Sequence, residues 1–183
     1  MTEELSLIKD VANRLTEAGI EYMITGSMAM AVYAVPRMTR DIDMVIHVTP
    51  GDAGKIVSLF HEDYYIDETN VQEAIQTRGM FNIIHNESII KVDFIVRKDD
   101  EYRITEFSRK RQMEIEEGTV WVVAPEDLIL SKLVWAKQSD SRMQLNDANQ
   151  ILAGVTSVDD DYLESWSQKL DVNDLLNEIR NNE

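Results

Sequence analysis

Asp41 and Asp43 are separated by one residue in a segment where apolar and polar residues alternate. Side chains two residues apart on a strand point to the same side, so this pair can bring two carboxylates to one or two divalent cations. Asp93 is a single acid within residues 89–96, on the face opposite the apolar residues of that segment. If the two strands are neighbours, three carboxylates converge, and such oxygen ligands suit Mg²⁺ or Mn²⁺ rather than zinc.

A second candidate is the turn Ile24-Thr25-Gly26-Ser27, between a short apolar strand and a run of small residues. Gly26 allows close approach of the backbone, the following N–H groups lie at a helix N-terminus, and the Ser27 hydroxyl can donate to an anion. Phosphate binding is one interpretation, and a simple turn and helix cap is the other. The turn is not a P-loop, because the Gly-x-x-x-x-Gly-Lys-Ser/Thr pattern does not occur.

Lysines near these motifs are weaker candidates. Lys91 lies two residues before Asp93 on the same strand face, where it could contact a phosphate or remain solvated. Lys132 and Lys137 lie on an otherwise apolar predicted helix, so either could face a cleft. The three histidines show no ligand spacing. We expect the three tryptophans in the core, although one of them could stack on a base. These residues are His47, His61, His85, Trp121, Trp135 and Trp166.

Composition limits the chemistry of the 183-residue chain. Cys is absent, which excludes disulfides, thiolate nucleophiles and Cys-based zinc sites. The 18 basic and 34 acidic residues give a formal net charge of −16, which opposes binding to nucleic acid unless a local basic patch exists. A candidate patch runs from Arg97 to Arg111, although a solvated loop and helix face is the simpler interpretation.

The chain is expected to be cytoplasmic. No apolar run approaches the roughly 18 to 20 residues needed to cross a bilayer, so no membrane association is expected. The first residues lack the basic flank and apolar stretch of a signal peptide.

Hydrophobic periodicity predicts an α+β fold in which a mixed sheet is covered by helices. In residues 41–48, Ile42, Met44 and Ile46 share a core face, and the opposite face begins with the two aspartates. Residues 80–85 and 89–97 are predicted to form a hairpin around Asn86-Glu87-Ser88. Further strands are expected at 21–25 and 120–123, and helices at 3–18, 27–34, 51–60 and 69–77.

After residue 123 the chain is expected to be helical. Pro125-Glu126-Asp127 predicts the start of a helix that runs to about residue 138, because Pro and acids favour the first turn. Later helices are centred on residues 145–152, 162–170 and 172–179, and Ser157 and Asp160 form a candidate capping pair for the second of these. We therefore expect a core of residues 1–123 and a helical portion of residues 124–183 that pack as one body.

The order and spacing of Gly26-Ser27, Asp41-Ile42-Asp43 and Asp93 resemble the signature of the polymerase-β-like nucleotidyltransferase superfamily. Residues 36–43 are also similar to the Arg-x-Thr-x-Asp-Ile-Asp form of bacterial members akin to abortive-infection, or toxin-like, nucleotidyltransferases. Residues 125–129, with Lys132, Arg142 and Asp147, look like the helical half of that group. One departure is that minimal members have Arg after Gly-Ser-x-Ala, whereas this chain has Met30.

The resemblance implies a nucleotidyltransferase-like core and metal-dependent transfer of a nucleoside monophosphate from a nucleoside triphosphate, such as ATP, to a hydroxyl, with release of pyrophosphate. It implies that Asp41 and Asp43 bind two Mg²⁺ or Mn²⁺ ions. It also implies that Asp93 binds one of them and helps to activate the acceptor. Gly26 and Ser27 would hold the β- and γ-phosphates, and Lys132 would contact the nucleotide.

Two alternatives remain at this point. A non-catalytic nucleotide- or partner-binding protein of the same fold is one, although such copies are free to lose the three carboxylates. A nucleotide-sugar glycosyltransferase could use the Asp-x-Asp pair, but it would leave the Gly26-Ser27 turn unexplained. The acceptor is unknown, and the net charge favours a small molecule or a protein hydroxyl over RNA. A partner protein in a toxin–antitoxin pair is also conceivable.

Overall fold

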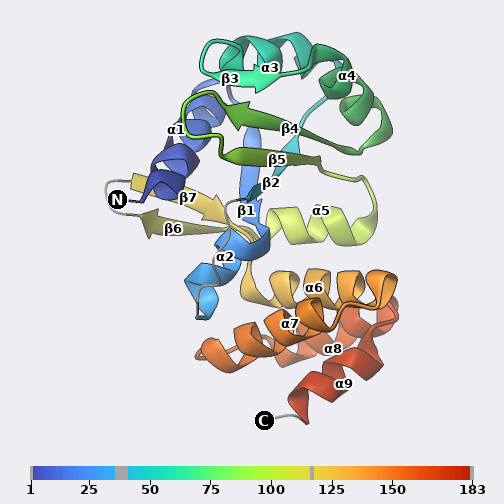
Figure 1. The fold of residues 1–183 in the computed structure, drawn as a ribbon. Coiled ribbons are helices and arrows are strands. Elements are labelled where there is room, and N and C mark those ends of the chain that lie inside the picture. The colour runs from blue at the N-terminus through green and yellow to red at the C-terminus, as the bar shows by residue number, and fades with distance from the viewer. Residues whose placement is uncertain (1, 36–40, 116–117, 182–183) are drawn as a thin grey trace.

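A computed structural model describes residues 2–35, 41–115 and 118–181. Its centre is a mixed sheet with the strand order β3-β4-β5-β2-β1-β7-β6 (Figure 1). Strands β2 and β5 pair in parallel, as do β1 and β7, and the other neighbouring strands are antiparallel. The strands are β1 (Glu21–Thr25), β2 (Ile42–His47), β3 (Tyr64–Ile66), β4 (Met80–His85), β5 (Lys91–Val96), β6 (Arg111–Ile115) and β7 (Gly118–Val122).

Helices cover the sheet and extend the molecule at one end. The first helix is capped at its N-terminus by the Thr2 side chain, which accepts a hydrogen bond from the Leu5 N–H. The helices are α1 (Glu3–Glu17), α2 (Gly26–Tyr33), α3 (Ala53–Phe60), α4 (Glu68–Thr77), α5 (Glu101–Ser108), α6 (Pro125–Ser139), α7 (Arg142–Gly154), α8 (Asp160–Lys169) and α9 (Asn173–Arg180).

The core follows the predicted alternation of the central strands. Ile42, Met44 and Ile46 are fully buried on one face of β2, as are Val92 and Phe94 on β5. The opposite face of the same two strands carries Asp43 and Asp93. The pattern that builds the core therefore also places the acidic side chains together on the other face.

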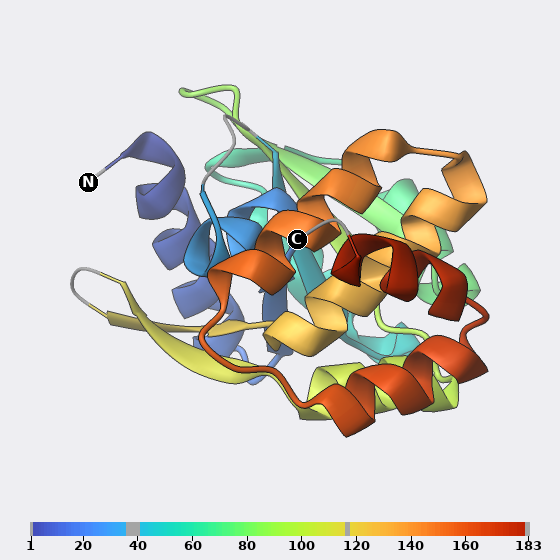
Figure 2. The ribbon, with the colours of Figure 1, turned by 90° about the horizontal axis from the view of Figure 1, so that it is seen from below.

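The last four helices gather beyond the sheet, at the C-terminal end of the chain (Figures 1 and 2). Helix α2 packs against α6 and α7, and Tyr102 on α5 contacts both α6 and α8. We propose a division into a core of residues 1–123 and a helical portion of residues 124–183. The contacts between the two parts support their packing as one body. None of the helices in the described ranges is long and apolar enough to cross a membrane.

Three details of the chain differ from the expectations. Strand β3 was not predicted, because three residues are too few to show a periodicity. Strand β6 was not predicted either, because it is a largely exposed edge strand of mixed polarity. The predicted cap of α8 was wrong, because Asp159, and not the Ser157 and Asp160 pair, accepts the hydrogen bond from the Tyr162 N–H.

Candidate active site

Two of the predicted acidic residues lie side by side in the sheet. Asp43 on β2 is the register partner of Asp93 on β5, and Asp41 lies just before β2 on the same side. Asp93 is only 7% exposed, whereas Asp41 is exposed. The strand pairing thus places Asp43 beside Asp93, and Asp41 lies near enough for its charge to act on Asp43.

The three carboxylates interact strongly. Burial, together with the charges of Asp93 and Asp41, raises the pKa of Asp43 from 3.8 to about 6. The ammonium groups of Lys132 and Lys91 oppose this shift without cancelling it. Negative charge is therefore concentrated here beyond what the neighbouring lysines neutralise, which is the electrostatic setting that a divalent cation would relieve.

The donor set fits a hard cation. Lys91 already supplies a positive charge, since its Nζ lies 2.8 Å from Asp93 Oδ2 and 4.0 Å from Asp41 Oδ1. Carboxylate oxygens are the ligands that Mg²⁺ and Mn²⁺ prefer. In the part of the chain that the structure describes, no three acidic or histidine side chains already surround one point as a metal cage. The metal-binding role of Asp41, Asp43 and Asp93 therefore stays a prediction.

Gly26 lies directly against the acidic side chains. It has a φ of +62°, and a Cβ at this position would overlap Oδ2 of Asp43. Thr25, the residue before it, is the register partner of Asp43. Gly26 and Ser27 are the first residues of α2, so the N-terminus of this helix adjoins the carboxylates. The proposed phosphate turn and the proposed metal site are thus adjacent.

Lys132 reaches the same place from α6. Its ammonium group is buried and lies 2.7 Å from Asp147 Oδ2 on α7. It lines the pocket that also holds Gly26 and Asp43, and its charge acts on Asp43. The structure therefore brings Lys132 to the candidate site, with Asp147 holding its position, whereas Lys137 pairs with exposed Asp171 instead.

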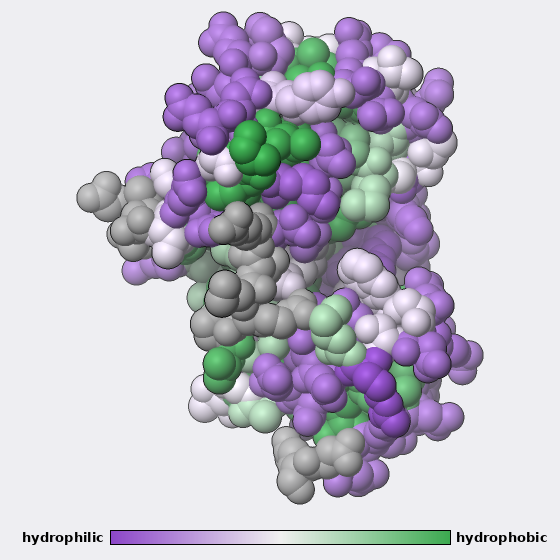
Figure 3. All heavy atoms as spheres, in the orientation of Figure 1, coloured by the Kyte–Doolittle hydropathy of each residue, from purple (hydrophilic) through white to green (hydrophobic). Residues whose placement is uncertain are grey.

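A pocket of about 400 Å³ extends from Gly26 and Asp43 between the sheet and α6. Figure 3 shows the surface hollowed between the sheet part and the helical end. Trp135, expected in the core, instead lines this pocket and is 58% exposed, which corrects the prediction. No sequence pattern indicates the other lining residues, because the fold alone brings them together. They include Met80, Arg103, Glu106, Ser131 and Gln138.

The candidate basic patch is largely neutralised by the chain's own acids. Five of its six cations have a carboxylate partner within 4.0 Å, and no such pair is found for Lys98 among the described residues. The five pairs are Arg97–Asp99, Arg103–Glu106, Arg109–Glu126, Lys110–Glu21 and Arg111–Glu126. Arg37 and Arg40, two further basic residues just before Asp41 in the sequence, fall outside the described residues.

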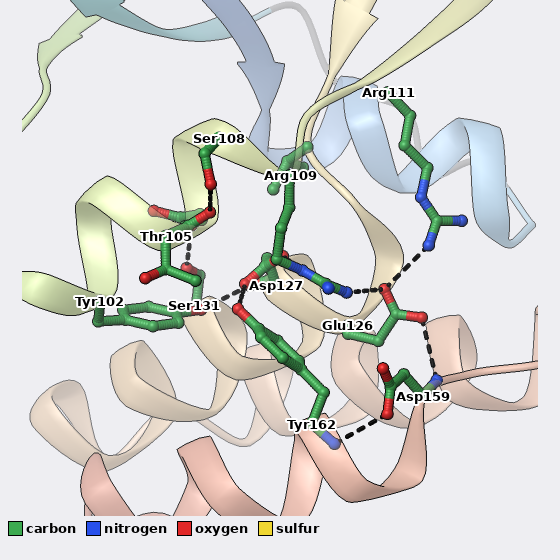
Figure 4. Close-up of polar contacts among 12 residues, drawn as sticks. Tyr102, Thr105, Ser108, Arg109, Arg111, Glu126, Asp127, Ser131, Asp159 and Tyr162 are labelled. Atoms are coloured by element: carbon green, nitrogen blue, oxygen red, sulfur yellow. Dashed lines mark hydrogen bonds and ion pairs between the residues drawn. The ribbon is translucent and has the colours of Figure 1, made fainter.

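Figure 4 shows a polar cluster, which we call the Arg109 cluster, formed by Arg109, Glu126, Asp127 and Tyr162. Arg109 Nε lies 2.9 Å from Asp127 Oδ2, and its Nη2 lies 3.1 Å from Glu126 Oε2. The Tyr162 hydroxyl donates to Asp127 Oδ1 at 2.5 Å, and the guanidinium carbon lies 3.7 Å from the centre of the Tyr162 ring. Glu126 and Asp127, predicted only as first-turn acids, therefore also join α6 to α8.

Comparison with known proteins gives one family match. The model of the family described as Aminoglycoside-2''-adenylyltransferase matches residues 7–134. No curated protein matches the sequence significantly.

Several solved structures share the fold at low sequence identity. ANT(2")-Ia in complex with adenylyl-2"-tobramycin is 15% identical with a TM-score of 0.58, over 92% of this chain and 97% of that one. Lincomycin-bound lincosamide antibiotic adenylyltransferase LnuA is 12% identical with a TM-score of 0.57, over 85% and 98%. An antigenic nucleotidyltransferase-like protein from Paracoccidioides brasiliensis is 17% identical with a TM-score of 0.59, over 82% and 74%. The predicted nucleotidyltransferase-like α+β fold is confirmed.

Proposed function

This chain belongs to the aminoglycoside-2''-adenylyltransferase family, and from that premise we propose that it transfers AMP from ATP to a hydroxyl of a small molecule, releasing pyrophosphate. The observation that carries this proposal is the contact of three groups. Asp43 is paired with Asp93 in the sheet, and Gly26 lies so close to Asp43 that no side chain fits between them. Carboxylates and a helix N-terminus at one point suit a nucleoside triphosphate and its metal.

Each residue has a distinct role in the proposed reaction. Asp41, Asp43 and Asp93 would hold Mg²⁺ or Mn²⁺, which when bound stabilises the attacking and leaving oxygens. The N–H groups of Gly26 and Ser27 would bind the β- and γ-phosphates at the start of α2. Lys132, held by Asp147, supplies a fixed positive charge for the triphosphate. Asp93 would also accept the proton of the acceptor hydroxyl.

The pocket supports a small-molecule acceptor. Its volume of about 400 Å³ is in the range of small-ligand sites, and it opens beside Asp43. RNA is less favoured, because Arg109, Lys110 and Arg111 are all engaged with carboxylates of this chain. A protein hydroxyl, a toxin-like role with a partner protein and a cytoplasmic location stay predictions. Family membership and fold leave no support for the glycosyltransferase alternative.

The test is transfer of label from ATP carrying ³²P in its α-phosphate, with Mg²⁺, to three separate pools: small metabolites with added tobramycin and lincomycin, proteins, and bulk RNA. The small-molecule pool should gain label with the wild type, and Asp43→Asn and Asp93→Asn should abolish transfer. Asp63→Asn is the control, because exposed Asp63 pairs with Arg14 on α1, and neither residue lines the pocket. Full transfer by Asp43→Asn would refute the site assignment, and label only in RNA would refute the acceptor class.

A further inference from the structure

Lys91 extends its ammonium group among the aspartates of the candidate site. Its Nζ is 2.8 Å from Asp93 Oδ2 and 4.0 Å from Asp41 Oδ1. The strand register explains this position. Lys91 and Asp93 share one face of β5, and β2 runs parallel beside β5, so that Asp41, one residue before β2, lies next to Lys91. One positive charge is thus shared by carboxylates that come from two strands.

We propose that Lys91 is a built-in counter-ion, which neutralises the carboxylates while no divalent cation is bound and weakens the site's affinity for that cation by competing with it. This inference rests on the proposed function, because it takes Asp41, Asp43 and Asp93 as the metal ligands. Neither the sequence motif nor the family match assigns this counter-ion role to Lys91.

Negative charge is crowded around Lys91. Asp93 is 7% exposed, and Asp43 lies beside it in the neighbouring strand, so water screens their repulsion poorly. An ammonium group at hydrogen-bond distance from Asp93 offsets that repulsion. Lys91 thereby allows β2 and β5 to pair in register without a metal ion.

Lys91 also occupies an oxygen atom that a metal ion would need as a ligand. Asp93 Oδ2 accepts a charge-assisted hydrogen bond from Lys91, so this oxygen is less available as a ligand until the ammonium withdraws. Lys91 is able to withdraw, because its side chain is 37% exposed and its stem is flexible. Lys132 differs in this respect, because its buried ammonium is held by Asp147. The site therefore has one fixed cation and one movable cation.

Calorimetric titration of the protein with Mn²⁺ alone measures the affinity of the site for the ion, and so tests this role without any measurement of activity. Lys91→Met should bind Mn²⁺ more tightly than the wild type, on the order of tenfold, because the competing charge is gone. Lys91→Gln is a second variant that keeps a polar side chain, and Lys91→Arg should restore the weaker affinity. Lys55→Met is the matched control, because it removes the same charge on α3 from a pair with Asp52, which lies just before that helix.

Thermal melting in EDTA gives an independent readout. Metal-free Lys91→Met should melt below Lys55→Met, and saturating Mn²⁺ should raise its melting temperature more than that of the wild type. Mn²⁺ affinity in Lys91→Met and Lys91→Gln that equals or falls below that of the wild type would overturn the counter-ion role.

A double variant separates this inference from the proposed function. Asp43→Asn combined with Lys91→Met should lose the tight Mn²⁺ binding if the aspartates are the ligands. If the double variant still binds Mn²⁺ tightly, or if neither the wild type nor any variant binds Mn²⁺, the metal assignment of the proposed function is refuted. The Lys91 role is then refuted with it. Failure of the Lys91 role alone would leave Mn²⁺ binding intact and dependent on Asp43.

Discussion

At the scale of single residues, Asp43 combines opposing requirements. The fold disfavours its charged form, whereas the proposed metal site requires that form. Its pKa is raised to about 6 by burial and by the two neighbouring aspartates, so the native state favours the protonated form. Between about pH 4 and pH 6 the unfolded chain releases this proton while the native protein retains it. The stability of the metal-free protein should therefore fall as the pH rises through this window.

Asp43→Asn should consequently stabilise the metal-free protein above pH 6. The shift from 3.8 to about 6 corresponds to roughly 2 to 3 kcal/mol of unfavourable free energy for the charged form. The gain should be largest near pH 8 and should disappear below about pH 4, where the carboxyl is protonated in both states. Urea unfolding in EDTA at several pH values measures it, and a loss of stability at pH 8 would contradict the electrostatic account.

Asp52→Asn provides a control of opposite sign. The Thr49 backbone N–H and hydroxyl donate to Asp52, which lowers the pKa of this carboxyl. Its contribution to stability is present above the unfolded pKa of about 4 and is lost as the pH falls further. Asp52→Asn should therefore destabilise the protein at pH 8, where Asp43→Asn stabilises it.

Gly26→Ala should disturb both the fold and nucleotide binding. The new Cβ would overlap Asp43 Oδ2, and the φ of +62° is unfavourable for alanine. Gly19→Ala isolates the backbone effect, because Gly19 has a φ of +69° and nothing within 4 Å of the added Cβ. Gly19→Ala should lose about 1 kcal/mol of stability, and Gly26→Ala should lose more.

Calorimetry with a non-hydrolysable ATP analogue and Mg²⁺ completes this comparison. Gly19→Ala should bind the analogue like the wild type, and Gly26→Ala should bind it weakly or not at all. Equal stability losses and equal affinities in the two variants would argue against a functional contact between Gly26 and Asp43.

At the scale of elements, the Arg109 cluster joins the end of α5 to the start of α6 and to α8. Asp127 has no exposed surface, and its carboxylate accepts hydrogen bonds from Arg109 and Tyr162. Because α6 also carries Lys132, this cluster helps to fix the wall of the pocket relative to the sheet. Removal of one partner of a buried ion pair leaves the charge of the other buried without compensation, which is strongly destabilising.

Arg109→Ala should destabilise the protein by about 3 to 5 kcal/mol, since it leaves a fully buried carboxylate unpaired. Lys137→Ala is the control, because its partner Asp171 is 92% exposed, and solvent screening leaves such surface pairs little effect on stability. Chemical denaturation of both variants measures the difference. A destabilisation below about 1 kcal/mol for Arg109→Ala would show that the cluster does not hold α8 to α6.

Elements with clear periodicity were predicted well from the sequence. Strand β2 and its acidic face followed from alternation, and α6 followed from Pro125 and the acids after it. Short or edge strands such as β3 and β6 were missed, because their residues show no repeat. The pocket and the Arg109 cluster were also missed, because they combine residues far apart in sequence, such as Arg109 and Tyr162. The metal and phosphate roles of the motif residues remain predictions.

At the scale of the whole molecule, the charge distribution disfavours binding of a polyanionic acceptor. The net charge of −16 repels phosphate backbones, and the cations of residues 97–111 are mostly paired with carboxylates of the same chain. The pocket beside Asp43 offers a concave site of small-molecule size instead. The charge distribution and the pocket therefore both support the proposed small-molecule acceptor.

Binding to bulk RNA should accordingly be weak and should depend little on salt. The triple variant Arg109→Ala, Lys110→Ala and Arg111→Ala should leave this weak binding unchanged, because these cations form ion pairs with Asp127, Glu21 and Glu126. Fluorescence titrations at several salt concentrations measure the slope of affinity against salt, and this slope would change by about one unit for each phosphate that the variant no longer binds. Since the variant also removes a buried pair, its folding is checked by circular dichroism, and Lys98→Ala tests the remaining cation alone. Tight, steeply salt-dependent binding by the wild type that either variant reduces would make RNA the acceptor to pursue.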